Sequence, residues 1–305
     1  MSINTIHRLD KIILPGGNEF AVLKNAKWAA GIQSLIQMPA GGTYPMFRAN
    51  QLQKPLVTFG TTQLDVLLTA VGADGASASG INTYFKLAGV AGNVARATAT
   101  HMKLAVSLAC VHWSTIRLTN QKDGEAQVQI TAVYDGVNAP FAYTGSVALS
   151  GSLVSGSFFG AGPVYINNVL IPGIQEITID SGIKLVQLSD SNEDFDTFVG
   201  VEAANPSITF KTLELVNWAS FGLQGTVLDG VHGIAAYGRK FSNFGSRVAA
   251  GTAQHLKFQG LYGTCIPMDS DGSGSNPMSD TVKVELAANA DAVNPLSVSA
   301  ASTIP

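Results

Sequence analysis

The stretch FRANQLQKPLVTFGTTQL, residues 47–64, returns 151 positions later as FVGVEAANPSITFKTLEL, residues 198–215, without a gap. Six of the 18 aligned positions are identical. Both copies place a proline before an alternating apolar run, a pattern typical of a strand that begins at the proline or lies at a sheet edge. The sequence therefore predicts two copies of one β-rich unit.

The repeat extends in both directions from this stretch. The further pairs are Gly31-Ile32 with Gly182-Ile183, 98–103 with 252–257, Cys110-Val111 with Cys265-Ile266, Val128 with Val282, and Pro140-Phe141 with Pro295-Leu296. Because these matches are collinear, we expect a first domain over residues 1–145 and a second over 162–305. A Gly/Ser-rich segment, residues 146–161, is predicted to be a packed linker.

The predicted fold class is mainly β, with two tandem β-sandwich or β-barrel domains and one short flanking α-helix in each. Apolar residues at i, i+3, i+4 and i+7 predict the helices. These residues are Leu64, Leu67, Leu68 and Val71 in the first copy and Leu215, Trp218, Ala219 and Gly222 in the second. Thr61 or Thr62 and Thr212 are the predicted N-caps, and Gly72 and Gly222 the predicted stops.

Composition narrows the class of protein. Of 305 residues, 46% are hydrophobic and only 13% charged, with a net charge of -3. The share of charged residues is about half the usual one. The high apolar content argues against a disordered chain, and the net charge of -3 argues against binding to nucleic acid through its phosphates. The apolar runs are too short for a membrane anchor. With two cysteines, Cys110 and Cys265, at equivalent positions in separate copies, we expect no disulfide and a reducing compartment.

A resemblance rests on the order of strands, turns and helix and on three segments of the second copy. These are 173–182 (GIQEITIDSG), 206–212 (PSITFKT) and 295–299 (PLSVS). In this the chain resembles the tail tube proteins of long-tailed bacteriophages. That family forms stacked hexameric rings around a lumen that conducts DNA. A duplicated member implies homotrimeric rings with pseudo-sixfold symmetry.

The resemblance further implies a non-enzymatic structural protein of the virion tail, assembled in the bacterial cytoplasm. Its expected partners are further copies of itself and other tail proteins, and DNA passes through without specific binding. One alternative is a trimeric hub at the tail tip. Another is a carbohydrate- or surface-binding β-sandwich, which would need an exposed platform built from Trp28, Trp113 or Trp218.

Local motifs point to few candidate sites, and neither a cofactor nor a catalytic residue is expected. Asp269, Asp271, Ser273 and Asp280 have the spacing of a calcium-binding loop, but position 8 is Asn276 and no helices flank the segment, so a solvated hairpin tip is favoured. His101 and His255 are aligned, yet they lack a nucleophile signature and are interpreted as packing residues.

An acidic cluster follows the paired strands of the second copy. Its members are Glu193, Asp194 and Asp196. One interpretation is a solvated loop. The other is a surface facing the lumen or the neighbouring ring, where negative charge would repel passing DNA.

Overall fold

A computed structural model describes residues 6–21, 23–89, 92–121, 124–149, 157–191, 193–213, 225–242, 245–271, 279–291 and 293–305. The first half contains β1 (Ile6–Leu14), η1 (Pro15–Gly17), β2 (Asn18–Phe20), β3 (Leu23–Ala29), β4 (Ile32–Gln37), β5 (Phe47–Gln53), β6 (Leu56–Thr61), α1 (Leu64–Val71), β7 (Ala76–Gly89), β8 (Gly92–Asn93), β9 (His101–Thr119), β10 (Glu125–Val133) and β11 (Phe141–Val147). The second half contains β12 (Phe158–Ile166), β13 (Val169–Ile171), β14 (Ile174–Asp180), β15 (Ile183–Ser189), β16 (Asp196–Ala204), β17 (Ser207–Thr212), β18 (Thr226–Val227), β19 (Ile234–Phe241), β20 (His255–Gly260), β21 (Tyr262–Asp271), β22 (Ser279–Ala287) and β23 (Ser297–Ser302). The prediction of a mainly β protein is confirmed.

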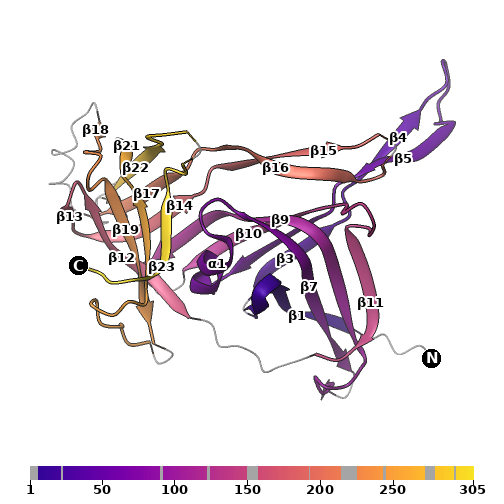
Figure 1. Cartoon of the computed structure of the whole chain (residues 1–305), viewed down its shortest axis with the longest axis horizontal. Helices are drawn as coiled ribbons and strands as arrows, with labels where there is room; N and C mark the ends of the chain where they lie inside the picture. Colours follow the sequence, from indigo (N-terminus) through magenta and orange to yellow (C-terminus); the bar gives the residue numbers. More distant parts are fainter. Residues whose placement is uncertain are drawn as a thin grey trace.

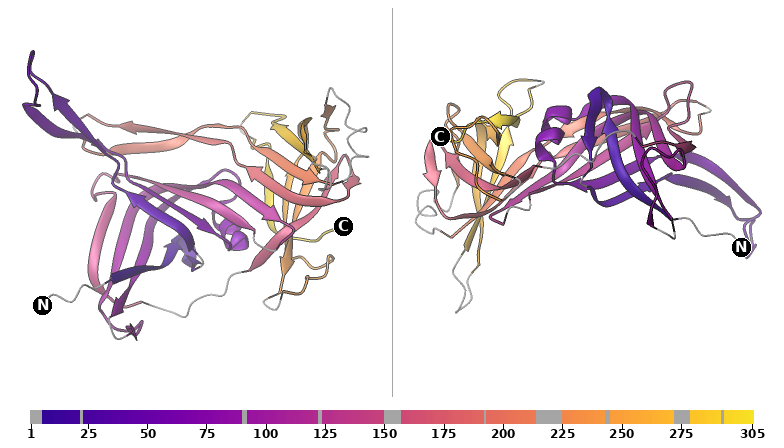
Figure 2. Two further views of the ribbon diagram at one scale, coloured as in Figure 1. Left: turned by 180° about the vertical axis from the view of Figure 1, so that it is seen from behind. Right: turned by 90° about the horizontal axis from the view of Figure 1, so that it is seen from below.

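One 14-stranded sheet runs through both halves of the chain, with the order β18-β21-β22-β17-β14-β9-β10-β6-β3 along its main path. The halves meet inside this sheet, where β14 pairs antiparallel with β9. A five-stranded sheet, β13-β12-β19-β20-β23, belongs to the second half alone. Two further hairpins, β4–β5 and β15–β16, extend along the long axis of the molecule in the same direction (Figures 1 and 2).

Strand boundaries recur at a fixed spacing. The bounds of β3 and β6 reappear 151 positions later in β14 and β17, and those of β10 reappear 154 positions later in β22. The counterparts of the long strands β7 and β9 are each broken in two, as β18 with β19 and β20 with β21. These breaks separate the two sheets of the second half, whereas in the first half both layers belong to one sheet.

The core lies on one face of the large sheet, because its strands alternate apolar and polar residues. The inward residues are at most 2% exposed. They include Val57, Phe59, Ile116, Leu118, Val128, Ile130, Ile177, Ile179, Ile208, Phe210, Val282 and Val284. Burying each such side chain contributes about 2 kcal/mol, so this face supplies most of the force that holds the layers together.

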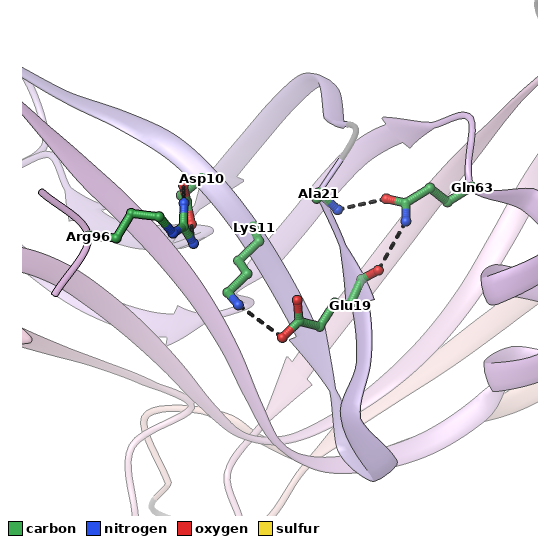
Figure 3. Close-up of polar contacts among 6 residues, drawn as sticks. All are labelled: Asp10, Lys11, Glu19, Ala21, Gln63 and Arg96. Carbon is green, nitrogen blue, oxygen red and sulfur yellow. Dashed lines mark hydrogen bonds and ion pairs between the residues drawn. The ribbon is translucent and has the colours of Figure 1, made fainter. Parts of the chain in front are cut away.

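The single α-helix of the described residues, α1, begins after Gln63, which makes no side-chain cap. The prediction that Thr61 or Thr62 caps it is wrong. Gln63 is held by tertiary contacts instead, since its Oε1 accepts from the Ala21 N–H at 2.6 Å and its Nε2 donates to the Glu19 carbonyl at 3.2 Å (Figure 3). The predicted stop at Gly72 is confirmed. The predicted second helix lies outside the described residues.

A polar cluster beside Gln63 distinguishes the first half from the second. Lys11 is 1% exposed and forms an ion pair with Glu19, and Arg96 forms a bidentate pair with Asp10 at 2.6 and 2.8 Å (Figure 3). By the spacing of 151 or 152 positions, the counterparts of Asp10, Lys11 and Glu19 are Gly162, Pro163 and Leu170. The cluster therefore belongs to one half only and ties β1 to β2 and to the segment that follows β8.

The structure places strand residues at both ends of the predicted linker and corrects the predicted equivalence of the two cysteines. Strand β11 continues through Val147 and β12 begins at Phe158, so both ends of the predicted linker 146–161 are strand, and 150–156 lies outside the described residues. The two cysteines are not equivalent, because Cys265 pairs with Val284 across the sheet where Val111, not Cys110, pairs with Ile130. Both thiols are free and buried, and burial raises the pKa of Cys265 to about 12.

Among the helical segments that the structure describes, none has the length and apolar character required to span a bilayer.

Candidate assembly interface

The outer face of the large sheet is mainly polar, with the exposed Ile266 and Met268 on β21 as apolar exceptions. Its side chains alternate with the buried ones, as in Thr115, Arg117, Gln127, Thr178, Lys211, Thr281 and Lys283. Lysine and arginine on this face pair with glutamate, at 2.7 Å for Lys24–Glu125 and 2.8 Å for Lys283–Glu285. This face was missed in the sequence, although the strict alternation in residues 127–130 and 281–285 could have revealed it.

The junction between the halves lies in this face. β14 and β9 pair from Glu176↔Thr119 to Asp180↔Thr115. Across the junction, the Arg117 guanidinium donates to both Glu176 oxygens, at 2.7 and 2.8 Å. These hydrogen bonds hold the pKa of Glu176 below its usual value. The junction is therefore a ladder of backbone bonds with a complementary charge pair on its polar side.

The counterparts of these junction strands are open edges. Within the described part of the chain, β3 pairs with β6 alone, and the end of β21, residues 269–271, pairs with β22 alone. β3 corresponds to β14, and the end of β21 corresponds to the end of β9. β3 thus lies at one end of the main strand path and β21 near the other, and β3 and the end of β21 each have one side unpaired in the described residues.

The β15–β16 hairpin, residues 183–204, lies over the first half, and we call it the covering hairpin (Figure 1). At its tip, the Asp194 carbonyl accepts from the Gln53 N–H and the Asp196 carbonyl from the Tyr134 N–H, both at 2.8 Å. The ring of Phe195 stacks on Tyr134 at 6.3 Å. This tip therefore links the second half to the first at a second place, away from the β9–β14 junction.

The tip contains the acidic cluster found in the sequence, and the structure divides it. Glu193 and Asp194 are exposed, whereas Asp196 is 1% exposed, with the Lys54 ammonium 3.4 Å from its carboxylate. An unpaired carboxylate there would be costly, so Lys54 is needed for the tip to dock.

The β4–β5 hairpin, residues 32–53, projects away from the body, and we call it the projecting hairpin (Figures 1 and 2). All six residues of β4 are exposed. Its exposed apolar side chains include Met38 at 54%, Tyr44 at 80%, Met46 at 81% and Phe47 at 48%. A cluster of large apolar side chains on a protruding element is typical of a protein–protein contact.

The four positions of the calcium-loop prediction are separated by the strands. Asp269 is exposed on β21, whereas Asp280 on β22 is 1% exposed and accepts from the Ser270 hydroxyl at 2.5 Å. Asp271 ends β21, and Ser273 lies outside the described residues. In the described ranges, no three His, Cys, Asp or Glu side chains group as a metal site would require. Calcium binding stays a prediction.

His101 and His255 make the same contacts in the two halves. Each is 0% exposed. The Nδ1 atom of each accepts a backbone N–H, from Leu87 at 3.0 Å and from Lys240 at 3.1 Å. The Nε2 atoms lie 3.0 and 2.9 Å from the carbonyls of Ala95 and Ala249. With both ring nitrogens used by the backbone, each histidine acts as a buried brace, in line with the packing interpretation.

Of the tryptophans considered for a ligand platform, Trp113 is buried, and Trp218 lies outside the described residues. Trp28 is 36% exposed and packs edge-on against Phe85 at 4.8 Å.

No protein-family model matches this chain, and neither does any curated protein.

Proposed function

We propose that this protein is a structural subunit of a phage-type tail tube, in which three chains form a ring and each chain supplies two similar tube domains. The observation that carries the proposal is the β14–β9 junction. It joins four strands of the second half (β21, β22, β17, β14) to four of the first (β9, β10, β6, β3) in one sheet. Repetition of this junction between chains would continue the sheet around a closed barrel, which removes exposed edges.

The edge strands have the charges that such a repeat needs. Transfer of the β14–β9 register to the open edges sets Lys27 of one chain opposite Asp271 of the next, and Ala29 opposite Asp269. The internal junction has the reverse polarity, with arginine on β9 and glutamate on β14. Pairing of β3 with β9 would therefore bring together like charges, as would pairing of β14 with β21. The proposed ring alternates first and second halves.

In this ring the polar sheet face would line the channel, because the opposite face is filled by the core. Its threonines, glutamines and paired charges present little net potential to a duplex. DNA held by lysine and arginine alone would bind through counterion release. The balanced pairs Lys24–Glu125, Arg117–Glu176 and Lys283–Glu285 avoid this. The channel face, rather than the acidic hairpin tip alone, would let DNA slide.

Electron microscopy of the concentrated full-length protein tests the proposal. We expect rings of three chains with six similar lobes, and stacks of these rings as hollow tubes. Rings that never stack would favour the tail-tip hub. Two-lobed monomers at every concentration would refute both.

A charge swap tests the edge pairing itself. Lys27→Glu should abolish rings, and adding Asp271→Lys should restore them. Lys103→Glu serves as the matched control, because it makes the same charge change near the start of β9, away from the open edges of β3 and β21. If Lys27→Glu assembles like the wild type, the β3–β21 contact is wrong.

A further inference from the structure

The two hairpins occupy equivalent positions but meet different surroundings. The pair Gln37↔Phe47 of the projecting hairpin corresponds to Leu188↔Phe198 of the covering hairpin, which closes one pair further, at Ser189↔Asp196. Each hairpin begins at a glycine with positive φ, Gly31 at 59° and Gly182 at 60°. The covering hairpin rests on the first half, and in the views of Figures 1 and 2 the projecting hairpin extends beyond the body.

The surface under the covering hairpin has a counterpart in the second half that is uncovered. Gln53, Lys54, Val133 and Tyr134 correspond to Ala204, Asn205, Ala287 and Ala288 at the spacings of 151 and 154 positions. Val133 is 1% exposed, whereas Ala287 and Ala288 are exposed. All four counterparts line one open hollow of about 620 Å³, which also includes Val293 and Pro295.

We propose that the tip of the projecting hairpin, centred on Tyr44, docks in this hollow on a second copy of the chain. This inference rests on the proposed ring and names the contact that would accompany each new β3–β21 junction. The covering hairpin provides the model for this contact, because its tip bonds to Gln53 and Tyr134 of its own chain. The projecting hairpin would contact the counterparts of these residues, Ala204 and Ala288, on another chain.

Between the two hairpins, the tip residues change, and so do the residues of the surface that receives each tip, which we call the receptor. Tyr44 stands where the covering hairpin has Phe195, and Pro45 stands where it has Asp196. The receptor changes to match, from Lys54 and Tyr134 in the first half to Asn205 and Ala288 in the second. The acidic tip meets a lysine, and the apolar tip would meet a hollow in which small apolar side chains lie beside Asp74, Asn205 and Asp291, with no lysine or arginine among the described residues that line it. Each tip thus suits its own receptor.

Exchange of the tips would be unfavourable in both directions. Asp196 against Asn205 would bury a carboxylate with no cation, and Pro45 against Lys54 would cover an ammonium with no anion. The hairpins therefore supply a second check on the alternation of halves, separate from the charges of the sheet edges. Specificity of this kind depends on what the wrong pairing costs as well as on what the right pairing gains.

Thiol cross-linking of the full chain tests the contact. In Tyr44→Cys/Ala288→Cys, a short bismaleimide should link chains, with the covalent trimer as the largest closed product. Phe195→Cys/Tyr134→Cys is the matched control within one chain, and should react without linking chains. Single variants show the background from Cys110 and Cys265, which are 8% and 0% exposed.

The outcomes separate this inference from the proposed function. Rings in the microscope with no cross-linking above the single variants would overturn the hairpin contact and leave the ring intact. Neither rings nor cross-links would overturn both.

A second variant needs no new thiols. Tyr44→Asp should keep the wild-type melting temperature and lower the fraction of chains in rings at least tenfold, whereas Val169→Asp, at a residue that is 61% exposed on β13, should not. Wild-type assembly by Tyr44→Asp would also contradict the contact.

Discussion

The covering and projecting hairpins are equivalent elements in the two halves, but one is docked on its own chain and the other is exposed. Both begin at a glycine with φ near 60°. One has an acidic tip that docks on a lysine of its own chain, and the other has an apolar tip that is exposed. They differ in the side chains at and under the tip, and in one further strand pair, Ser189↔Asp196, in the covering hairpin. Contact within the chain thus depends on side-chain chemistry that the projecting hairpin lacks.

The largest expected effect comes from the glycine at the start of each hairpin. A Cβ at Gly182 would overlap the Asn205 carbonyl, and a Cβ at Gly31 would overlap the Lys54 carbonyl. We expect Gly182→Ala to cost about 4 kcal/mol, because the covering hairpin is fixed at both ends, and Gly31→Ala about 2 kcal/mol, because the projecting hairpin can tilt. Chemical denaturation measures both. Gly251→Ala, with open space around it, is the control, and equal losses would contradict the comparison.

His101 and His255 make the same contacts in the two halves, so their variants test whether equal contacts give equal stability. His101→Ala and His255→Ala each remove the partner of one backbone N–H and one backbone carbonyl and open a cavity where a side chain with 0% exposure had been. We expect a loss of about 3 kcal/mol for each variant, equal within about 1 kcal/mol. Thermal and urea unfolding of the two variants side by side provide the measurement. If one variant lost much less stability than the other, the two histidines would share their geometry but not their contribution to the free energy of unfolding.

One of the positions at which the receptor surfaces of the two halves differ has Lys54 in the first half and Asn205 in the second. Lys54→Met should lower the free energy of unfolding by about 2 kcal/mol, because it leaves the Asp196 carboxylate buried and unpaired. Asp196→Asn added to Lys54→Met should recover most of this loss. At the counterpart position, Asn205→Met should change stability by less than about 0.5 kcal/mol. Urea denaturation measures all three, and a Lys54→Met chain as stable as the wild type would show that the tip docks without the ion pair.

The smallest effect concerns the charge pair at the internal junction. Arg117 and Glu176 are 60% and 31% exposed, so the pair contributes about 0.5 kcal/mol. Because folding lowers the pKa of Glu176, this contribution is present above pH of about 4.3 and is lost as the pH falls through the folded pKa. NMR titration of the Glu176 carboxyl should show the low pKa, and Arg117→Ala should return it to the usual range. An unchanged pKa of Glu176 in that variant would show that Arg117 does not cause the low pKa.

Sequence reasoning recovered the strands at which the repeat is clearest. It predicted a strand after the proline of each copy, and β6 and β17 begin directly after Pro55 and Pro206. It placed the stop of α1 at Gly72 but missed Gln63, because that side chain is fixed by Ala21 and Glu19, 42 and 44 residues away. A cap is a local signal, whereas a contact at this distance has no local signature.

The polar residues show the same division. The sequence grouped Glu193, Asp194 and Asp196 by spacing, but burial separates Asp196 from the other two. Asp269 and Asp280 are likewise divided, one exposed and one buried. Asp196 begins β16, whereas Glu193 and Asp194 precede that strand. Asp280 lies opposite Ser270, and because side chains alternate along a strand, Asp269, the neighbour of Ser270, faces the other side of the sheet.

By itself, the sequence determined the β class, the repeat and the boundaries of many strands, since alternation, proline and glycine act over a few residues. Only the tertiary structure decided that the two halves share one sheet at β9–β14, that one hairpin covers its own chain, and that β3 and β21 end as open edges. Those outcomes depend on which strands meet across more than fifty residues. Backbone hydrogen bonds are the same for every strand pair, so the choice lies with the buried side chains and the paired charges that only the folded chain brings together.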